Sequence, residues 1–487
     1  MNPVKNKLAV GTLFLMIAQF SVAFTGYFIH IILGRMLGPA LYGDFGIINS
    51  LMLINTALFL TGTSRAVSKY IAEDENQAGI ISLAGIKFQL ILSAGCVLFY
   101  LLFSSTIAIL FKDVTLRPLI FLASFVVITQ GMYTIIVKGY LNGVRDFKRQ
   151  AIIEIALSFS RVIVALVLLY FGFGVGGVVT AYVITPLIIL LFIPELMKSI
   201  KSRSSFNLSN LASYVFPITL SLAIFVIGME SGILFIKVLL PDDSFTGLYT
   251  AAATFPKMLY SLFIALSFSI LPAISSAFAA KNKVLLHKYI YQSTRYSIMI
   301  LVPAAALMSV YASNLIDLFY AAPYSGAGPV LEVLIFSSIF YSLFLTMNSI
   351  ISVTDKPGST IFLSSIFMLT AFIFNFLFIP RFSLFGAALA AVLSGFVGVL
   401  VSSIYLYRRL GALFPFKSFV KVLVAALTMY LGAAWIDVSG WLFIPAAVGW
   451  LLLYLLLLYL FGELNVEDLR LLFSMLRRPL STLSTKK

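Results

Sequence analysis

Long apolar runs recur along the chain and constrain its fold more than any other feature. An α-helix needs roughly 20 apolar residues, at 1.5 Å each, to cross about 30 Å of hydrocarbon, and the runs are at least about this long. Residues 8–32 and 442–461 are apolar on every helical face, which excludes the alternating pattern of barrel strands. Hydrophobic residues make up 61% of the 487 positions and charged residues only 10%. The sequence therefore predicts an all-α integral membrane protein.

We expect about fourteen transmembrane helices, one for each run. The first run is too long for the apolar core of a cleavable signal peptide, so we expect the chain to be anchored by its own spans. The predicted spans are residues 8–32, 44–64, 85–111, 118–140, 151–171, 175–197, 213–240, 248–276, 296–320, 329–352, 359–379, 384–407, 419–437 and 441–462.

The first twelve spans show internal repetition. Residues 42–45 (YGDF) open the second span, and residues 247–249 (GLY) open the eighth, about 207 positions later. Residues 174–181 (GVGGVVTA) correspond to residues 383–390 (SLFGAALA) at an offset of about 209. Because each copy has an even number of spans, both enter the membrane from the same side, and a pseudo-two-fold axis along the membrane normal should relate them.

This repetition predicts two parallel six-helix lobes, residues 1–204 and 205–410. Residues 411–462 would add helices 13 and 14. Residues 463–487 would form a cytoplasmic amphipathic tail, because apolar residues recur there at helical spacing and basic residues lie elsewhere on the helical wheel.

Basic residues predict the orientation of the chain. Most of the 33 Lys and Arg residues fall at the termini or in loops on the same side of the membrane as the termini. The opposite loops hold only Arg35, Lys112, Arg117, Lys237 and Arg381. Since basic loops stay in the cytoplasm, we expect both termini to be cytoplasmic in a cell (plasma or inner) membrane. The net charge of +15 mostly reflects this bias, so we do not expect nucleic-acid binding.

Charged residues inside the spans are the strongest functional candidates. A charge near mid-bilayer costs at least about 2.5 to 3.5 kcal/mol on insertion scales and usually faces a partner or a wet cavity. At 1.5 Å per residue, Glu230 lies roughly 15 Å from the outer end of the seventh span, and Lys257 lies about 13.5 Å into the eighth. The two share a depth, so they could form a structural ion pair, or Glu230 could couple transport to an ion.

Basic residues outnumber acidic ones among these candidates. Arg161 lies deep in the fifth span, where it fits a cavity-lining or a structural role, and Glu154 lies two helical turns away on the same face. The other bases lie near span ends, where Lys and Arg also reach lipid head groups. A cavity between the spans would be net cationic and suited to phosphate. The candidate substrate-binding residues are Arg35, Arg65, Lys138, Arg161 and Lys257, and the candidate ion-coupling residues are Glu154 and Glu230.

Three stretches carry a resemblance to a known family. They are residues 32–45, which begin ILGRMLGP and end in the YGDF turn, residues 140–147 (YLNGVRDF) and residues 270–275 (ILPAIS). In their order, spacing and duplication, the first twelve spans resemble the polysaccharide and lipid-linked oligosaccharide flippases of the multidrug/oligosaccharidyl-lipid/polysaccharide exporter superfamily.

The resemblance implies a fold and a function. The two lobes would form a V around a cationic cavity, lined by spans one, two, seven and eight, where Arg35, Arg65, Glu230 and Lys257 fall. Alternating access would move a glycan linked to a polyprenyl phosphate or pyrophosphate from the cytoplasmic to the outer leaflet. The related lipid II flippases have Arg in the eighth span where this chain has Lys257, so the resemblance leaves the substrate and the coupling ion open.

Two other functions stay open: a cation-coupled drug antiporter of the same superfamily, whose cavity would be acidic or aromatic, and a non-transporting scaffold of a glycan-assembly complex. An enzyme is not expected, because the predicted outer loops are too short to carry catalytic carboxylates or histidines. Neither a metal nor a cofactor is expected, and coupling to Na⁺ or H⁺ is left open. The expected partners are a lipid-linked glycan, membrane lipids, and a glycan polymerase or glycosyltransferases.

Overall fold

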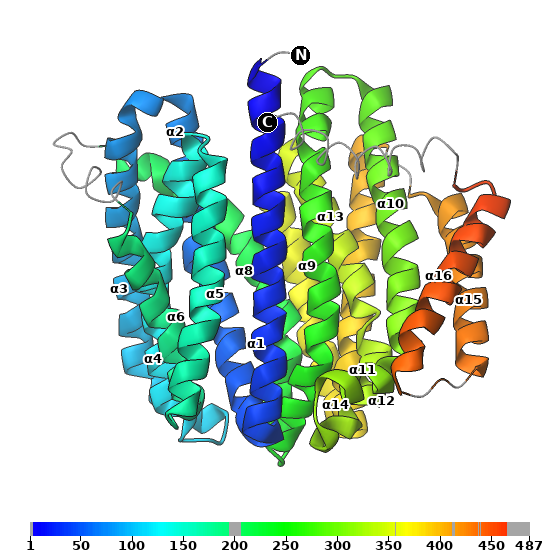
Figure 1. The fold of residues 1–487 in the computed structure, drawn as a ribbon. Helices are drawn as coiled ribbons and strands as arrows, with labels where there is room; N and C mark the ends of the chain where they lie inside the picture. The colour runs from blue at the N-terminus through cyan, green and yellow to red at the C-terminus, as the bar shows by residue number, and fades with distance from the viewer. Residues whose placement is uncertain are drawn as a thin grey trace, which may run out of the picture. The chain divides into compact units, whose positions relative to one another are not determined.

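The computed structural model describes residues 3–193, 206–355, 357–411, 414–436, 438 and 440–464. Every regular element in these ranges is helical, which confirms the predicted all-α membrane class (Figure 1). The α-helices are α1 (Pro3–Asn55), α2 (Thr61–Glu73), α3 (Ala78–Leu110), α4 (Leu116–Thr134), α5 (Phe147–Tyr170), α6 (Gly174–Leu191), α8 (Leu208–Leu239), α9 (Ser244–Ala279), α10 (Lys283–Val310), α11 (Ala312–Phe319), α12 (Gly328–Leu334), α13 (Ser337–Thr354), α14 (Pro357–Leu410), α15 (Phe416–Trp435) and α16 (Phe443–Leu460). Two π-helical segments are η1 (Thr56–Leu60) and η3 (Ile135–Leu141). Three 3₁₀ turns are η2 (Glu75–Gln77), η4 (Ala322–Ala327) and η5 (Gly440–Leu442).

Within the described residues, 11 helices are long and apolar enough to cross a membrane. Two of them, Phe14–Glu73 and Gly358–Leu410, are far longer than one span needs. Each contains a break: Gly38 has φ 74° and precedes Pro39, and Ser383 has φ 53°. Each therefore comprises two successive helices, and α9 adds another of 36 residues. The arrangement is compatible with the predicted 14 spans.

The chain divides into two compact units. The larger unit comprises Phe14–Thr254 and Lys356–Ser394, and the smaller unit comprises Met1–Leu13, Phe255–Asp355 and Gly395–Lys487. The predicted boundary at residue 204 and the predicted tail helix lie outside the described residues. The two lobes and their V-shaped arrangement stay predictions.

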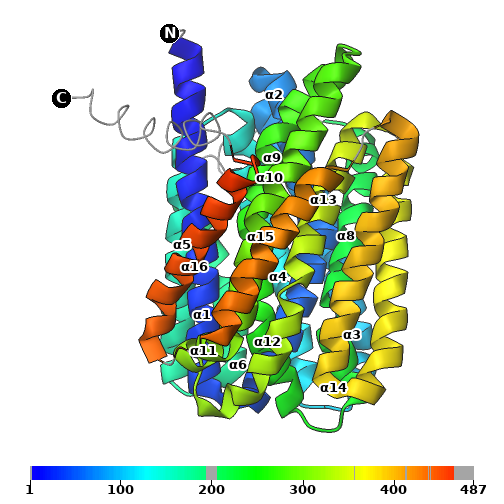
Figure 2. The same cartoon turned by 90° about the vertical axis from the view of Figure 1, so that its right-hand side faces the viewer.

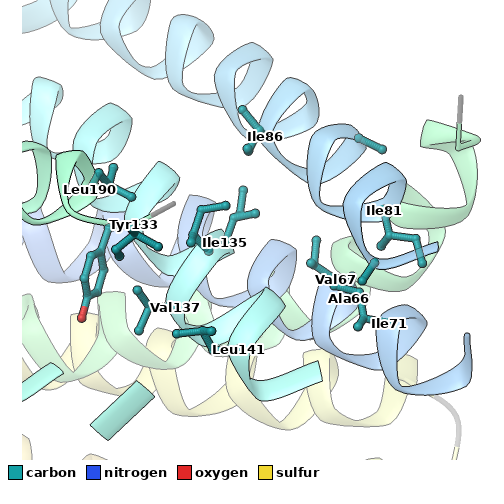
Figure 3. Close-up of a cluster of buried hydrophobic side chains, with 14 of the residues drawn as sticks. Ala66, Val67, Ile71, Ile81, Ile86, Tyr133, Ile135, Val137, Leu141 and Leu190 are labelled. Carbon is teal, nitrogen blue, oxygen red and sulfur yellow. The ribbon is translucent and has the colours of Figure 1, made fainter. Parts of the chain in front are cut away.

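Small residues allow the helices of the larger unit to pack closely. Val67 of α2 lies between Gly85 of α3 and Gly139 of η3, where an added Cβ would come within 2.5 Å and 2.9 Å of its methyl groups. Close backbone approach of this kind stabilises helix contacts in lipid, where association gains little from the hydrophobic effect. Figure 3 labels ten members of this buried cluster: Ala66, Val67, Ile71, Ile81, Ile86, Tyr133, Ile135, Val137, Leu141 and Leu190.

In the smaller unit, the C-terminal helices α15 and α16 dock onto α10. Figure 2 shows α15 and α16 side by side. Tyr454 of α16 donates a hydrogen bond to the carbonyl of Met299 at 2.8 Å. Beyond α16, the buried Glu463 lies 2.6 Å from Arg295 Nε and 3.4 Å from Lys421 Nζ. The hydrogen bond and the Arg295–Glu463 ion pair thus connect the C-terminal helices to α10, and the Lys421–Glu463 ion pair connects α15 to the residues beyond α16.

The stretches aligned from the sequence share a backbone geometry. Gly174 and Ser383, which start the aligned stretches, both have φ 53°. Three residues later, Gly177 and Gly386 both pack against the preceding helix: an added Cβ would lie 2.9 Å from Leu168 Cβ and 2.2 Å from the Phe378 carbonyl oxygen, respectively. The two aligned stretches thus form tight helical hairpins of the same construction.

Candidate functional site

Glu230 of α8 is buried in the larger unit, with 1% of its surface exposed. Ser50, in the second half of α1, donates a hydrogen bond to Glu230 Oε2 at 2.6 Å. The next residue of α8, Ser231, accepts a hydrogen bond at 2.9 Å from the side-chain amide of Asn375 in α14. Ser50 and Glu230 therefore bring side-chain oxygens from two helices into contact, and Asn375 approaches the next residue of α8 through its amide nitrogen. Oxygen ligands of this kind suit a hard cation, and the carboxylate itself can take up a proton.

Glu154 of α5 is the centre of a second polar network. It is 3% exposed and accepts hydrogen bonds from Gln150 at 2.9 Å and from Gln19 at 3.3 Å. Lys138 Nζ lies 4.0 Å from Glu154 Oε2, an ion pair that sequence reasoning did not predict. The network continues from Gln150 to Asn142. Lys138 lies in the π-helical segment η3, and such segments occur frequently at functional sites.

Arg161, two turns beyond Glu154 on α5, has partners of its own. Its Nη2 donates a hydrogen bond to Gln130 Oε1 at 2.8 Å, and its guanidinium lies 4.4 Å from the ring centroid of Tyr182. The aromatic face and the amide hold the guanidinium plane in place between α4, α5 and α6. This supports a fixed position for the Arg161 cation within the larger unit.

The candidate bases are far more accessible than the two candidate acids. Arg35 and Arg65 are exposed, although the residues on either side of Arg65 are buried. The Lys138 side chain is 43% exposed. Lys257 and Arg161 are partly exposed, and Lys257 belongs to the smaller unit. A ligand that reaches these helices would therefore meet positive charge.

An ion cluster that we did not predict surrounds the buried side chain of Lys237. The sequence predicts that Lys237 lies in an outer loop. In the structure it lies in the last turn of α8, and its side chain is 2% exposed. Its Nζ lies 2.7 Å from Asp243, 2.8 Å from Asp113 and 3.5 Å from Asp44. Two sequence signals could have located the cluster: Asp44 belongs to the YGDF turn, and Asp243 follows Lys237 by six residues.

These features define a multi-span membrane protein with charged side chains inside its helices, as is typical of transporters. The model of a family described as "Polysaccharide biosynthesis protein" matches residues 32–329. This stretch is more than half of the chain, and the chain belongs to that family. The family resemblance seen in the sequence is confirmed.

Two curated relatives match shorter segments. An uncharacterized membrane protein of Methanocaldococcus jannaschii is 29% identical over 136 residues, which cover 27% of this chain and 26% of that protein. The capsular polysaccharide biosynthesis protein CapF of Staphylococcus aureus is 28% identical over 140 residues, which cover 29% of this chain and 35% of CapF. The matched segments thus span only about a quarter to a third of these relatives.

Solved structures match over most of the chain. The lipid II flippase MurJ in an inward closed conformation superposes with a TM-score of 0.77 at 18% identity, covering 92% of this chain and 98% of MurJ. An inward-facing multidrug resistance MATE family transporter of the MOP superfamily gives 0.62 at 16% identity, with 80% and 98% covered. A MOP superfamily transporter from Pyrococcus furiosus gives 0.61 at 15%, with 83% and 95% covered. At these identities the similarity establishes the fold.

Proposed function

We propose that this protein is a flippase that moves a glycan linked to a polyprenyl phosphate or pyrophosphate from the cytoplasmic to the outer leaflet by alternating access. The family and the fold define the class of protein, a membrane protein of polysaccharide biosynthesis built like flippases and transporters. The substrate, the direction of movement and the cytoplasmic position of both termini are part of the proposal. A glycan polymerase or glycosyltransferases would act on the same lipid-linked unit.

One observation carries the choice of substrate: the candidate bases are accessible and the candidate acids are not. Glu154 and Glu230 are 3% and 1% exposed, whereas Arg35 and Arg65 are exposed. A phosphate or pyrophosphate can accept charge-assisted hydrogen bonds from accessible guanidinium groups, and these are about twice as strong as hydrogen bonds between neutral groups. The arrangement therefore favours an anionic carrier.

The same observation weighs against the drug antiporter. A cationic drug in an acidic cavity needs accessible carboxylates, but here Gln150 and Gln19 donate hydrogen bonds to the buried Glu154, and Ser50 donates one to the buried Glu230. A scaffold without transport activity would not depend on the accessible charges at all. Neutralising those charges therefore separates the flippase from both alternatives.

The test is transport of a fluorescent polyprenyl pyrophosphate-linked sugar in proteoliposomes, read by quenching of outer-leaflet probe. Each charge-assisted hydrogen bond contributes about 1.5 to 3 kcal/mol, so we expect the Arg35→Gln, Arg65→Gln double variant to transport at least tenfold more slowly. The matched control is Arg117→Gln, which neutralises an exposed Arg in the first turn of α4. Wild-type transport by the double variant would overturn the substrate assignment.

We further propose that a buried carboxylate couples transport to Na⁺ or H⁺. Glu230 is the stronger candidate, because its carboxylate is 1% exposed and Ser50 donates a hydrogen bond to it, and Glu154 is the second. Replacing Glu230 by Gln keeps the shape and one acceptor oxygen but removes the titratable group. Transport by Glu230→Gln should therefore no longer respond to an imposed Na⁺ or pH gradient, while equilibration without a gradient persists.

The predicted pairing of Glu230 with Lys257 needs its own measurement. If Glu230 serves only to neutralise Lys257, removing Lys257 leaves a buried unpaired carboxylate, which typically costs about 3 to 5 kcal/mol, and removing both residues restores stability. A double-mutant cycle with Glu230→Gln and Lys257→Gln measures this directly. Recovery of stability and of gradient-driven transport together would reject coupling by Glu230.

A further inference from the structure

The ion cluster around Lys237 joins the end of α8 and the residues that follow it, which hold Lys237 and Asp243, to two segments far away in the chain. Asp44 lies just after the break in α1, Asp113 lies in the turn between α3 and α4, and Asp243 lies between α8 and α9. All four residues belong to the larger unit. Figure 1 shows the break in α1, the α3–α4 turn and the end of α8 at the same end of the ribbon.

The buried ammonium group of Lys237 lies within 3.5 Å of three carboxylates. Lys237 Nζ donates hydrogen bonds to Asp113 Oδ2 at 2.8 Å and to Asp243 Oδ1 at 2.7 Å, and Asp44 Oδ1 lies 3.5 Å away. Thr115 fixes Asp113, because its backbone N–H donates a hydrogen bond to Asp113 Oδ1 at 3.0 Å. Removing one partner of a buried ion pair is strongly destabilising, so this contact resists separation of the segments.

The charges of the cluster do not balance. Burial raises the pKa of Asp113, but hydrogen bonds from Lys237 and Thr115 and the Lys237 charge outweigh it, so the pKa lies below its usual value. Asp113 is therefore ionised at neutral pH. With one ammonium among several carboxylates, loss of the ammonium would leave like charges facing one another, which repel and favour separation.

A glycine-lined contact lies next to the cluster. Gly43 and Gly46 of α1 approach α9 so closely that an added Cβ would lie 2.2 Å from Thr246 Oγ1 and 2.2 Å from Thr250 Oγ1. On the facing helix, Gly247 approaches the Pro39 carbonyl oxygen in the same way. Close packing and a Tyr42–Thr254 hydrogen bond of 3.5 Å hold α1 against α9, and the ionic contacts beside them add to the resistance of this end to parting.

We propose that Lys237, Asp44, Asp113 and Asp243 form an ionic latch that holds the outer ends of the helices together while the transporter is open to the cytoplasm. The proposal rests on the alternating access and orientation of the proposed function. Asp44 and Asp113 belong to the first predicted copy, and Lys237 and Asp243 to the second. When the copies separate at this end, Lys237 gives up Asp44 and Asp113 but keeps Asp243, its neighbour in sequence. The ammonium therefore never loses all of its partners, and the latch can open and re-form.

The latch is tested by thiol accessibility, which measures conformation independently of transport. Thr250→Cys, in a background where Cys96 is Ala, places a reporter at a buried position of the glycine-lined contact, seven residues beyond Asp243. Intact cells and inside-out vesicles are treated with a membrane-impermeant maleimide. We expect Lys237→Met to increase the labelling rate from outside by about tenfold or more.

Two further variants keep the test decisive. Asp113→Asn weakens the latch while Lys237 keeps Asp243, so it should fold even where Lys237→Met does not, and should give a smaller increase. Lys112→Met is the matched control, because it makes the same Lys-to-Met change at an exposed position in the turn that holds Asp113. We expect this control to leave the labelling rate unchanged. Unchanged labelling in folded Lys237→Met or Asp113→Asn protein overturns the latch, whether or not the protein transports lipid-linked glycans. If the labelling rate increases only in inside-out vesicles, the latch does not lie at the outer end of the helices. An increase from outside, in protein that moves no such glycan, supports the latch and rejects only the proposed substrate.

Discussion

Replacing Gly247 by Ala tests the closest helix contact in the larger unit. The added Cβ would lie 1.9 Å from the Pro39 carbonyl oxygen and 2.6 Å from its carbon. Non-bonded heavy atoms pack at about 3.5 to 4.0 Å, so one backbone must move by roughly 1.5 Å, and no side-chain rotation can relieve the clash. Overpacking typically costs about 1 to 3 kcal/mol, and this site should lie near the upper end. The gain in helix propensity from Gly to Ala returns about 0.5 to 1 kcal/mol, which leaves a net loss of about 2 kcal/mol in the free energy of unfolding.

The chain carries its own reporter for this measurement. Cys96 is the single cysteine and is buried, so a dye that fluoresces on reaction with thiols labels the protein only as it unfolds. A loss of about 2 kcal/mol should increase the open population roughly 30-fold at a fixed temperature, if labelling follows local unfolding equilibria. Gly449→Ala in α16 is the control, because nothing lies within 4 Å of its added Cβ, and it should be neutral or slightly stabilising. Equal labelling of the two variants would refute the close contact between α1 and α9.

Three further predictions concern charge. Burial raises the pKa of Glu463, but hydrogen bonds from Ser418 and Arg295 and the charges of Arg295 and Lys421 outweigh burial, so the pKa lies below its usual value. The ionised Glu463 carboxylate therefore contributes its full stabilisation above about pH 4.3, and this contribution is lost as the pH falls through the pKa of the folded state. Arg295→Met should flatten that acid loss in melting curves recorded against pH, and an unchanged profile would contradict the ion pair. Lys148→Cys, at an exposed site in a cysteine-free background, should resist an impermeant maleimide outside intact cells; strong labelling there would reverse the predicted orientation. Arg161→Lys keeps the charge but loses the planar contact with Tyr182, so it should destabilise by about 0.5 to 2 kcal/mol in the same dye assay; a stability equal to wild type would exclude a stacked Arg161.

Sequence reasoning located the charged residues inside the spans but did not assign most of their partners. Glu154 and Arg161 were expected on one face of one helix, and each has its own partners in the structure. Lys138 was a candidate base, but its approach to Glu154 was not foreseen. Lys237 was counted as a loop residue because it is basic and near a span end, the position where a Lys normally reaches lipid head groups.

What the sequence by itself determined is the membrane class, the number of apolar runs and the family. A segment in lipid must satisfy its backbone hydrogen bonds within itself, so run length and composition suffice to identify a spanning helix. Only the tertiary structure decided which side chains meet. Gln19 and Glu154 are 135 positions apart, and Lys237 and Asp113 are 124 apart. Such contacts depend on helix packing and on breaks such as the one at Gly38, and packing follows from the shapes of several helices at once rather than from any local pattern.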